Sequence, residues 1–265
     1  MSNFNTEIRK TILRIIHESH AAHTGTSLSA VEILIAVFKS MDLEKIKKHN
    51  NARDRIILSK GHGTAALYAV MYHFGLLTED EINTYFKNGT VLAGHTSHHV
   101  PFVEHSTGAL GHGLPVALGI ALGLRSLKLG GRSFVVTGDG ELHEGSNWEA
   151  IMLAGHMKMQ NLCLLVDKNG LSQVGRVDEC CTVDPLKEKF ESFNFAAYEV
   201  DGHDDNKIQE IIQKTENSEK PVAIVCHTVK GKGISFMEHN NEWHYMGPQG
   251  EDYEKVVEEL ENASS

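Results

Sequence analysis

Residues 133–170, SFVVTGDGELHEGSNWEAIMLAGHMKMQNLCLLVDKNG, decide the fold of this 265-residue chain. Ser133–Thr137 is a short β-branched run typical of a buried strand, and Asn161–Asp167 is a second such run. Ser146–Gly155 lies between them and has the pattern of a helix, with a Ser-x-x-Glu capping box at its start. A strand, a helix and a strand in this order predict two parallel strands joined by a crossover.

Polar residues follow both predicted strands. Gly138-Asp139-Gly140-Glu141 follows the first strand, and Asn169 follows the second, 169 − 139 = 30 positions after Asp139. Ligands of parallel sheets bind at the carboxyl ends of the strands, so Asp139 and Asn169 should lie together. A carboxylate, an amide oxygen and a backbone carbonyl such as that of Leu171 are ligands that Mg²⁺ or Ca²⁺ takes, together with phosphate oxygens. Either motif alone would be a plain turn, but the pair predicts a site for a diphosphate and a metal.

The Gly-Asp-Gly and Asn spacing resembles the thiamine-diphosphate fingerprint, and specifically that of the transketolase family. Four further segments carry the resemblance. Asp54–Gly63 resembles the family's Asp-Arg-Phe-Val-Leu-Ser-x-Gly-His segment. Ala93-Gly94-His95, Ser106–Gly113 and Ala22-His23-Thr24 are similar to its Pro-Gly-His, Thr-Gly-Pro-Leu-Gly-Gln-Gly and Gly-His-Pro motifs. The resemblance spans roughly residues 10 to 250 and implies thiamine diphosphate with Mg²⁺ (or Ca²⁺) as cofactors.

The resemblance also implies roles for single positions. A lone histidine is usually a surface or satisfied core residue, and most of the 17 histidines are interpreted that way. In the family, however, histidines ring the thiazolium end of the cofactor, where an imidazole can donate, accept or shuttle a proton. The catalytic residues implied are His23, His62, His95 and His244. Those implied to bind the cofactor are His62, Gly108, Ala109, Leu110, Gly140, Glu141, Asn169 and His244, and those implied to bind the metal are Asp139, Asn169 and Leu171.

Chain length points to a partner. Transketolases with all their domains on one chain are more than twice as long, so residues 1–265 are expected to form a single diphosphate- and Mg²⁺-binding domain with a short helical tail at Glu251–Asn262. The resemblance then implies that a separate carboxyl-terminal subunit supplies the glutamate that activates the cofactor, in an α₂β₂ assembly. Glu144 and Glu149 match a pattern that lies at the interface between subunits in the family. The alternative is that both are solvated acids near a helix start.

The rest of the chain alternates between predicted strands and helices. Strands are expected at Arg55–Leu58, Ala196–Val200 and Val222–Cys226, and a capped helix that starts near Ser27 or Ser29 should run to Phe38. Further helices are expected at Asn3–Ile16, Thr64–Phe74, Leu114–Leu129, Pro185–Phe193 and Asn206–Thr215. This alternation predicts an α/β fold with a parallel sheet covered by helices on both faces.

Composition favours a cytoplasmic enzyme subunit. The chain is 41% hydrophobic and 23% charged, with a formal net charge of −10, which argues against general nucleic-acid or anionic-membrane binding. No uncharged apolar run reaches the length of a membrane span. The four cysteines do not form a disulfide framework and are expected to be free thiols. The histidine-rich stretches lack the Cys pairs or His-Glu-x-x-His pattern of a zinc site.

We therefore expect the amino-terminal subunit of a two-chain transketolase, which would move a two-carbon ketol unit from a ketose or ketose phosphate to an aldose or aldose phosphate. A deoxyxylulose-phosphate synthase-like or 2-oxo-acid dehydrogenase α-like subunit would have the same diphosphate and metal site, although His23, His62 and His95 argue against both. A non-catalytic cofactor-binding module is the third alternative. Thr24 and Ala109 replace prolines of the family, and the loop at 172–181 differs from its usual short turn, so substrate preference could be altered.

Overall fold

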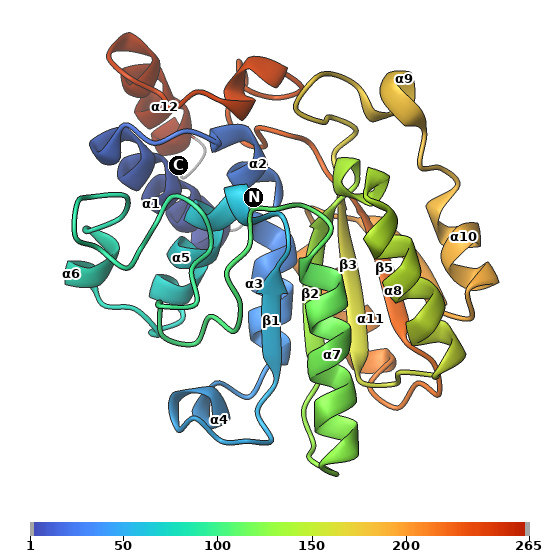
Figure 1. Cartoon of the computed structure of the whole chain (residues 1–265). Helices are drawn as coiled ribbons and strands as arrows, with labels where there is room; N and C mark the ends of the chain where they lie inside the picture. Colours follow the sequence, from blue (N-terminus) through green and yellow to red (C-terminus); the bar gives the residue numbers. More distant parts are fainter. Residues whose placement is uncertain (1–2, 263–265) are drawn as a thin grey trace.

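The computed structural model describes residues 3–262 and contains a five-stranded parallel sheet with helices on both sides (Figure 1). All four pairs of neighbouring strands are parallel, and Gly138 at the end of β2 stands in register with Asp167 of β3. The predicted α/β fold class is therefore confirmed. The strands, in their order across the sheet, are β1 (Arg55–Leu58), β2 (Ser133–Gly138), β3 (Leu162–Lys168), β5 (Val222–His227) and β4 (Ala196–Asp201).

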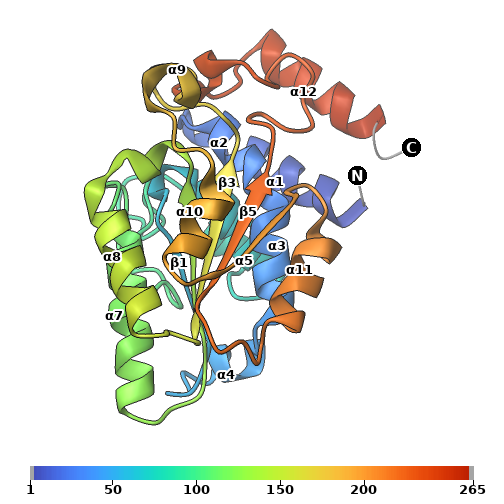
Figure 2. The same ribbon diagram turned by 90° about the vertical axis from the view of Figure 1, so that its right-hand side faces the viewer.

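Alternate side chains along each strand pack into two separate hydrophobic cores, one on each face of the sheet. Phe134 and Val136 of β2 join one core, whereas Val135 joins the other, because successive side chains of a strand point to opposite faces. Figure 2 shows the two helical layers on either side of the sheet. The first core includes α1 (Asn3–Ser19), α3 (Val31–Ser40), α5 (Thr64–His73) and α11 (Asp205–Lys214), and the second includes α7 (Gly113–Ser126), α8 (Gly145–His156) and α10 (Leu186–Ser192).

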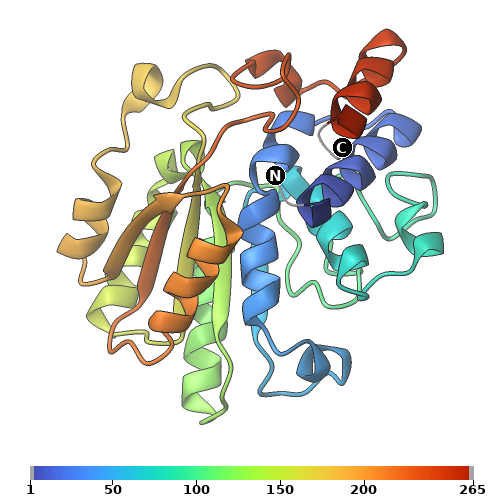
Figure 3. The same cartoon turned by 180° about the vertical axis from the view of Figure 1, so that it is seen from behind.

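Short helices and loops gather at the carboxyl ends of the strands. In Figure 2 the β5 arrow points toward the side where α2 (Thr24–Ser29), α9 (Val177–Cys181) and α12 (Glu251–Asn262) lie, and Figure 3 shows the molecule from behind the view of Figure 1. The tail helix α12 lies where it was predicted, with Val256 and Leu260 buried and Val257 partly exposed. The short helices are α2 (Thr24–Ser29), α4 (Leu43–Lys47), α6 (Glu79–Ile82), α9 (Val177–Cys181), η1 (Gly61–Gly63), η2 (Gly140–His143) and η3 (Asn241–His244), with α12 (Glu251–Asn262) the last element. Of these, α4 lies at the opposite end of the sheet (Figure 1).

Two predicted helix caps are wrong, and a serine explains each. The Ser146 hydroxyl does not cap α8 but donates to the Gly111 carbonyl, 2.7 Å away. The helix expected from Ser27 or Ser29 begins earlier, at Thr24, and Ala30 separates α2 from α3. The Ser29 hydroxyl donates to the Asp167 carboxylate at 2.6 Å instead of capping a helix. Contacts between distant segments therefore replaced the local caps that the sequence pattern suggested.

All four cysteines are free thiols, and Cys163 and Cys226 are buried in strands, as predicted, while Cys180 and Cys181 are exposed. Among residues 3–262, no helix combines the length and the apolar character that crossing a bilayer requires.

Candidate active site

Asp139 and Asn169 meet at the carboxyl edge of the sheet, as their positions after β2 and β3 predict. The Asp139 carboxylate accepts hydrogen bonds from the Gly140 and Gly170 backbone N–H groups, at 2.9 and 2.7 Å. The Asn169 side-chain oxygen accepts from the Leu171 N–H at 3.1 Å. These backbone donors fix both side-chain oxygens at the end of the strands.

The Asp139 carboxylate is nearly inaccessible to solvent, with 2% of its surface exposed. Burial, reinforced by the nearby charge of Asp167, raises the pKa of Asp139 to about 6, against the opposing effect of its two backbone hydrogen bonds. Within residues 3–262 no lysine or arginine forms an ion pair with this carboxylate. A buried carboxylate without such a partner is well suited to a divalent cation, so the residues present fit the predicted metal.

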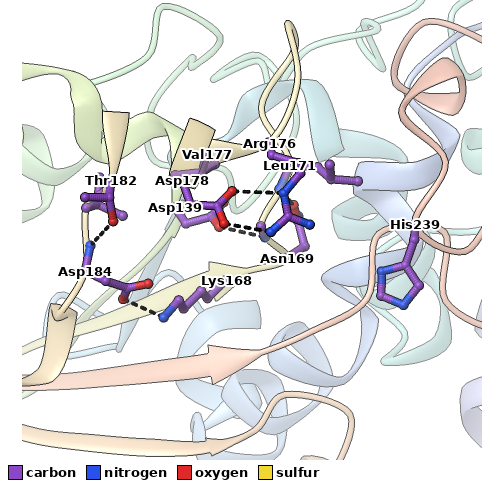
Figure 4. Close-up of a pocket in the computed structure, with 12 residues that line it drawn as sticks. Asp139, Lys168, Asn169, Leu171, Arg176, Val177, Asp178, Thr182, Asp184 and His239 are labelled. Atoms are coloured by element: carbon purple, nitrogen blue, oxygen red, sulfur yellow. Dashed lines mark hydrogen bonds and ion pairs between the residues drawn. The ribbon is translucent and has the colours of Figure 1, made fainter. Parts of the chain in front are cut away.

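Asp139, Asn169 and Leu171 line two adjoining cavities of about 570 and 280 Å³. Figure 4 shows the smaller one, in which Lys168 reaches toward Asp184 and the two side chains form an ion pair at 2.5 Å. The three predicted metal ligands therefore stand between the two cavities. A cation bound by these oxygens would be accessible from either cavity.

The four predicted catalytic histidines come together in the larger cavity from four separate parts of the chain. The His23 ring centroid lies 5.5 Å from that of His62, 5.4 Å from His95 and 5.5 Å from His244. The His62 and His244 centroids are 5.3 Å apart. His23 precedes α2 with φ of 68°, a left-handed conformation that costs energy for a non-glycine residue and is often found at functional sites.

Burial lowers the pKa of every histidine in this cluster, which favours the neutral form. It lowers the pKa of His23 to about 4, with His95 and Lys230 adding to the effect, and the pKa of His244 to about 3, with Lys230 as the next cause after burial. The pKa of His62 is also held well below its ordinary value, chiefly by burial, and that of His95 is lowered for the same reason. Neutral imidazoles can both donate and accept hydrogen bonds, which suits the recognition of sugar hydroxyls.

A pH titration of the isolated chain tests this neutrality. Ring ¹⁵N chemical shifts of His23 and His244 should remain those of neutral imidazole at pH 6, where an ordinary histidine is mostly protonated. Because their folded pKa values lie below the unfolded one, the unfolded chain binds more protons, and stability should fall as pH drops from about 6.5 toward 4. Titration midpoints near 6.5 for both residues would contradict the neutral cluster.

The loop at 108–110 reaches the cavity at two of its three predicted positions. Gly108 and Leu110 line it, whereas Ala109 is exposed and does not. Gly108 has φ of 138°, and a Cβ there would lie 2.8 Å from the His95 ring, so only glycine lets this loop approach the imidazole.

Gly140 and Glu141 also line the larger cavity. The Glu141 carboxylate is buried and accepts from the Gly111 and Gly138 N–H groups at 3.0 and 3.2 Å, and from the Ser59 hydroxyl. Burial raises the pKa of Glu141, and these hydrogen bonds oppose the rise. With these bonds, Glu141 ties the Gly138–Gly140 turn to the loop that carries Leu110.

The two predicted interface residues lie outside both cavities. Glu144 immediately precedes α8, Glu149 lies within it, and both side chains are exposed.

Two lysines of the site were missed by the sequence prediction. Lys60 is 1% exposed and forms a buried ion pair with Asp167. Lys230 Nζ lies 2.9 Å from His244 Nδ1 and 3.0 Å from the Asn241 side-chain oxygen, and burial, with Lys60, lowers its pKa to about 8. Lys60 follows β1 and Lys230 follows β5, so the rule that found Asp139 and Asn169, a polar residue just after a strand, would have found both.

Residues 2–260 match the family model described as "Transketolase, thiamine diphosphate binding domain". One of the chains of the apulose-4-phosphate transketolase of Actinobacillus succinogenes is 38% identical over 256 residues, which are 96% of this chain and 93% of that protein. The 6-deoxy-6-sulfo-D-fructose transketolase subunit SqwG of Clostridium sp. is 35% identical, over 96% of this chain and 94% of that protein.

A solved structure of transketolase from Pichia stipitis, in complex with sedoheptulose-7-phosphate, superposes with a TM-score of 0.90 at 27% identity. The match covers 98% of this chain and 40% of the Pichia chain. This chain therefore spans about 40% of the solved transketolase and nearly the whole of the two relatives above.

Proposed function

The chain belongs to the transketolase family, in its thiamine diphosphate-binding domain, and we propose that it is the amino-terminal subunit of a two-chain transketolase. The observation that carries the proposal is the larger cavity, where four histidines stand beside the buried Asp139 carboxylate. The relatives of similar length are themselves named as single subunits of transketolases, which supports the two-chain assignment. We propose that residues 1–265 form one domain with a helical tail.

In this proposal Asp139, Asn169 and the Leu171 carbonyl would hold Mg²⁺ (or Ca²⁺), which would supply positive charge for the diphosphate. Lys230 lies in the same cavity as Asp139 and adds a positive charge for the diphosphate. When bound, thiamine diphosphate supplies the nucleophilic carbon that attacks the carbonyl of a donor ketose. The chain's own side chains would orient the sugar and accept its proton.

The histidines orient the sugar. His23, His62, His95 and His244 present neutral ring nitrogens, which can donate to a carbonyl oxygen or accept from a hydroxyl. A neutral imidazole can also take up the proton that a hydroxyl loses when the carbon–carbon bond breaks. Gly108 and Leu110 line the cavity, and Ala109, which is exposed, lies outside it.

A separate carboxyl-terminal subunit is proposed to supply the activating glutamate, in an α₂β₂ assembly. The exposed side of α7 and α8 is a suitable contact surface, because Gly119 and Gly123 leave open space and Met152 is 57% exposed. Glu144 and Glu149 lie at the start of and within α8, consistent with the interface role that the resemblance implies. A cytoplasmic location stays a prediction from composition.

The relatives indicate which donor to test first. One is named for apulose-4-phosphate and another for 6-deoxy-6-sulfo-D-fructose, so both are named for sugars that carry an anionic group. We propose a ketose with a terminal phosphate or sulfonate as the donor class and an aldose as the acceptor.

Calorimetric titration of thiamine diphosphate with Mg²⁺, with the partner subunit present, tests the proposal. Saturable binding that is lost when Mg²⁺ is chelated is the expected result. An absence of binding would contradict the proposal, binding without ketol transfer would support a non-catalytic cofactor-binding module, and turnover that requires pyruvate or another 2-oxo acid would support the rival enzyme classes.

A further inference from the structure

A buried polar network lies behind the larger cavity and touches neither cavity. Arg9 of α1 and Glu32 of α3 are 0% and 1% exposed and form a two-point ion pair, with N···O distances of 2.6 and 2.9 Å. His203, in the turn between β4 and α11, extends the network through its Nδ1, which lies 2.9 Å from the second Glu32 oxygen. Three distant segments therefore meet at one carboxylate.

The hydrogen bonds of His203 fix its tautomer. Its Nε2 accepts a hydrogen bond from the Val229 backbone N–H at 2.8 Å, so the ring proton must lie on Nδ1, where it is donated to Glu32. Burial alone would raise the pKa of Glu32, but the hydrogen bond from His203 and the charge of Arg9 hold it at about 2. The carboxylate thus remains charged and keeps the imidazole oriented toward Val229.

The same network anchors the segment that carries Lys230. His203 holds the Val229 N–H on one side of Lys230, and Arg9 Nε donates to the Lys232 carbonyl, 2.9 Å away, on the other side. Between them Gly231 has φ of 84°, and a Cβ there would lie 2.2 Å from the Met237 carbonyl oxygen. A backbone in this left-handed, crowded conformation depends on neighbouring groups to fix its path.

Arg9 also contacts α2, the helix that follows His23. One of its terminal nitrogens lies 3.4 Å from the Leu28 carbonyl in α2, the helix that His23 precedes. The Gly231 N–H also donates to the Gly25 carbonyl of α2 at 2.9 Å. The segment that carries Lys230 and the helix that follows His23 are therefore fixed relative to each other by the same buried arginine.

We propose that Arg9, Glu32 and His203 are positioning residues that hold Lys230 in the cavity that would receive the cofactor's diphosphate. The inference rests on the proposed function for the identity of the ligand, but the anchoring itself can be measured without any ligand. None of the three residues touches the reacting groups. Their effect passes through the backbone at Val229 and Lys232.

Two substitutions of His203 separate the anchoring from general stability. His203→Gln extends an amide oxygen toward the position of Nε2, where it can still accept from the Val229 N–H. His203→Asn is shorter and places its amide near Nδ1, so it can contact Glu32 but cannot reach Val229. The two variants lose the same imidazole and differ in the bond that the proposal requires.

In the assembled two-chain enzyme, His203→Asn should weaken binding of thiamine diphosphate with Mg²⁺ by about tenfold, as loss of groups that orient ligand-binding side chains generally does. His203→Gln should retain most of the affinity. Without ligand, hydrogen–deuterium exchange at the Val229 and Lys230 amides should speed up in the Asn variant much more than in the Gln variant. Thermal unfolding of both variants provides the stability control.

Equal affinity and equal amide exchange in the two variants would overturn the proposal, because the network would then be only structural. If the unsubstituted enzyme binds no thiamine diphosphate, the proposed function fails, and amide exchange alone decides the anchoring. In that case faster exchange in His203→Asn than in His203→Gln supports it, and equal exchange overturns it.

Discussion

Replacing Asp139 with alanine is expected to abolish Mg²⁺-dependent binding of thiamine diphosphate and ketol transfer. Loss of an outer partner of a metal ligand typically costs about 10–100-fold in affinity or activity, so loss of the ligand itself should exceed about 100-fold. The Asp139 carboxylate is also the buried group on which the Gly140 and Gly170 N–H groups converge. Calorimetry with the partner chain present measures the binding, and a coupled assay measures the transfer.

Two further variants test whether the effect of Asp139→Ala comes from the loss of the charge at this position. Asp139→Asn keeps the size of the side chain but removes its charge, and it should bind thiamine diphosphate almost as poorly as Asp139→Ala. Asp252→Asn removes a charge from a partly exposed side chain of α12, outside both cavities, and should leave binding unchanged. Binding by Asp139→Asn within a few-fold of the unsubstituted chain would show that this carboxylate holds no cation.

Replacing Lys60 with methionine is expected to destabilise the chain by roughly 3–5 kcal/mol, the usual cost of leaving one member of a buried ion pair without its partner. Lys60 and Asp167 are 1% and 0% exposed. Asp167 also accepts hydrogen bonds from the Ser29 and Thr228 hydroxyls, so the methionine variant would retain a buried, hydrogen-bonded anion without a cation. Urea unfolding at pH 8 gives the difference in free energy.

The stability that Lys60→Met loses should depend on pH in one direction, becoming smaller in acid. In the unsubstituted chain, burial alone would raise the pKa of Asp167, but Lys60 and the hydroxyl hydrogen bonds lower it, so its stabilising effect is lost only as pH falls through that lowered value. Without Lys60, burial should raise the pKa instead, and protonation should relieve the stability deficit as pH falls toward 4. Lys48→Met, which removes an exposed lysine, serves as the control and should cost less than about 1 kcal/mol. A Lys60→Met deficit that grows with acid would contradict the buried pair.

The elements that the sequence predicts best depend on local pattern. β2, α8 and β3 follow from one β-branched run, one helical pattern and a second strand, and Asp139 and Asn169 follow from their positions after those strands. The histidines His23 and His62 needed the family resemblance, because nothing local distinguishes them from surface or core histidines. The structure then brought all four predicted histidines to one cavity.

The features that the sequence does not predict depend on contacts between distant residues. Arg9 bonds to the Lys232 carbonyl across 223 positions, and Ser29 reaches Asp167 across 138 positions. A serine that precedes a helical pattern has the same local signal whether it caps that helix or bonds to another strand. The failed caps and the anchoring network around Lys230 therefore have one cause, which is that tertiary hydrogen bonds outweigh local preference.

Ketol transfer by the reconstituted pair tests the central claim most directly. The chain and the product of its adjacent reading frame would be purified separately and assayed alone and together with a ketose phosphate or sulfonate, an aldose acceptor, thiamine diphosphate and Mg²⁺. The account predicts no transfer by this chain alone and cofactor-dependent transfer by the mixture. Robust transfer by the isolated chain would contradict it, because the activating glutamate would then have to lie within residues 1–265.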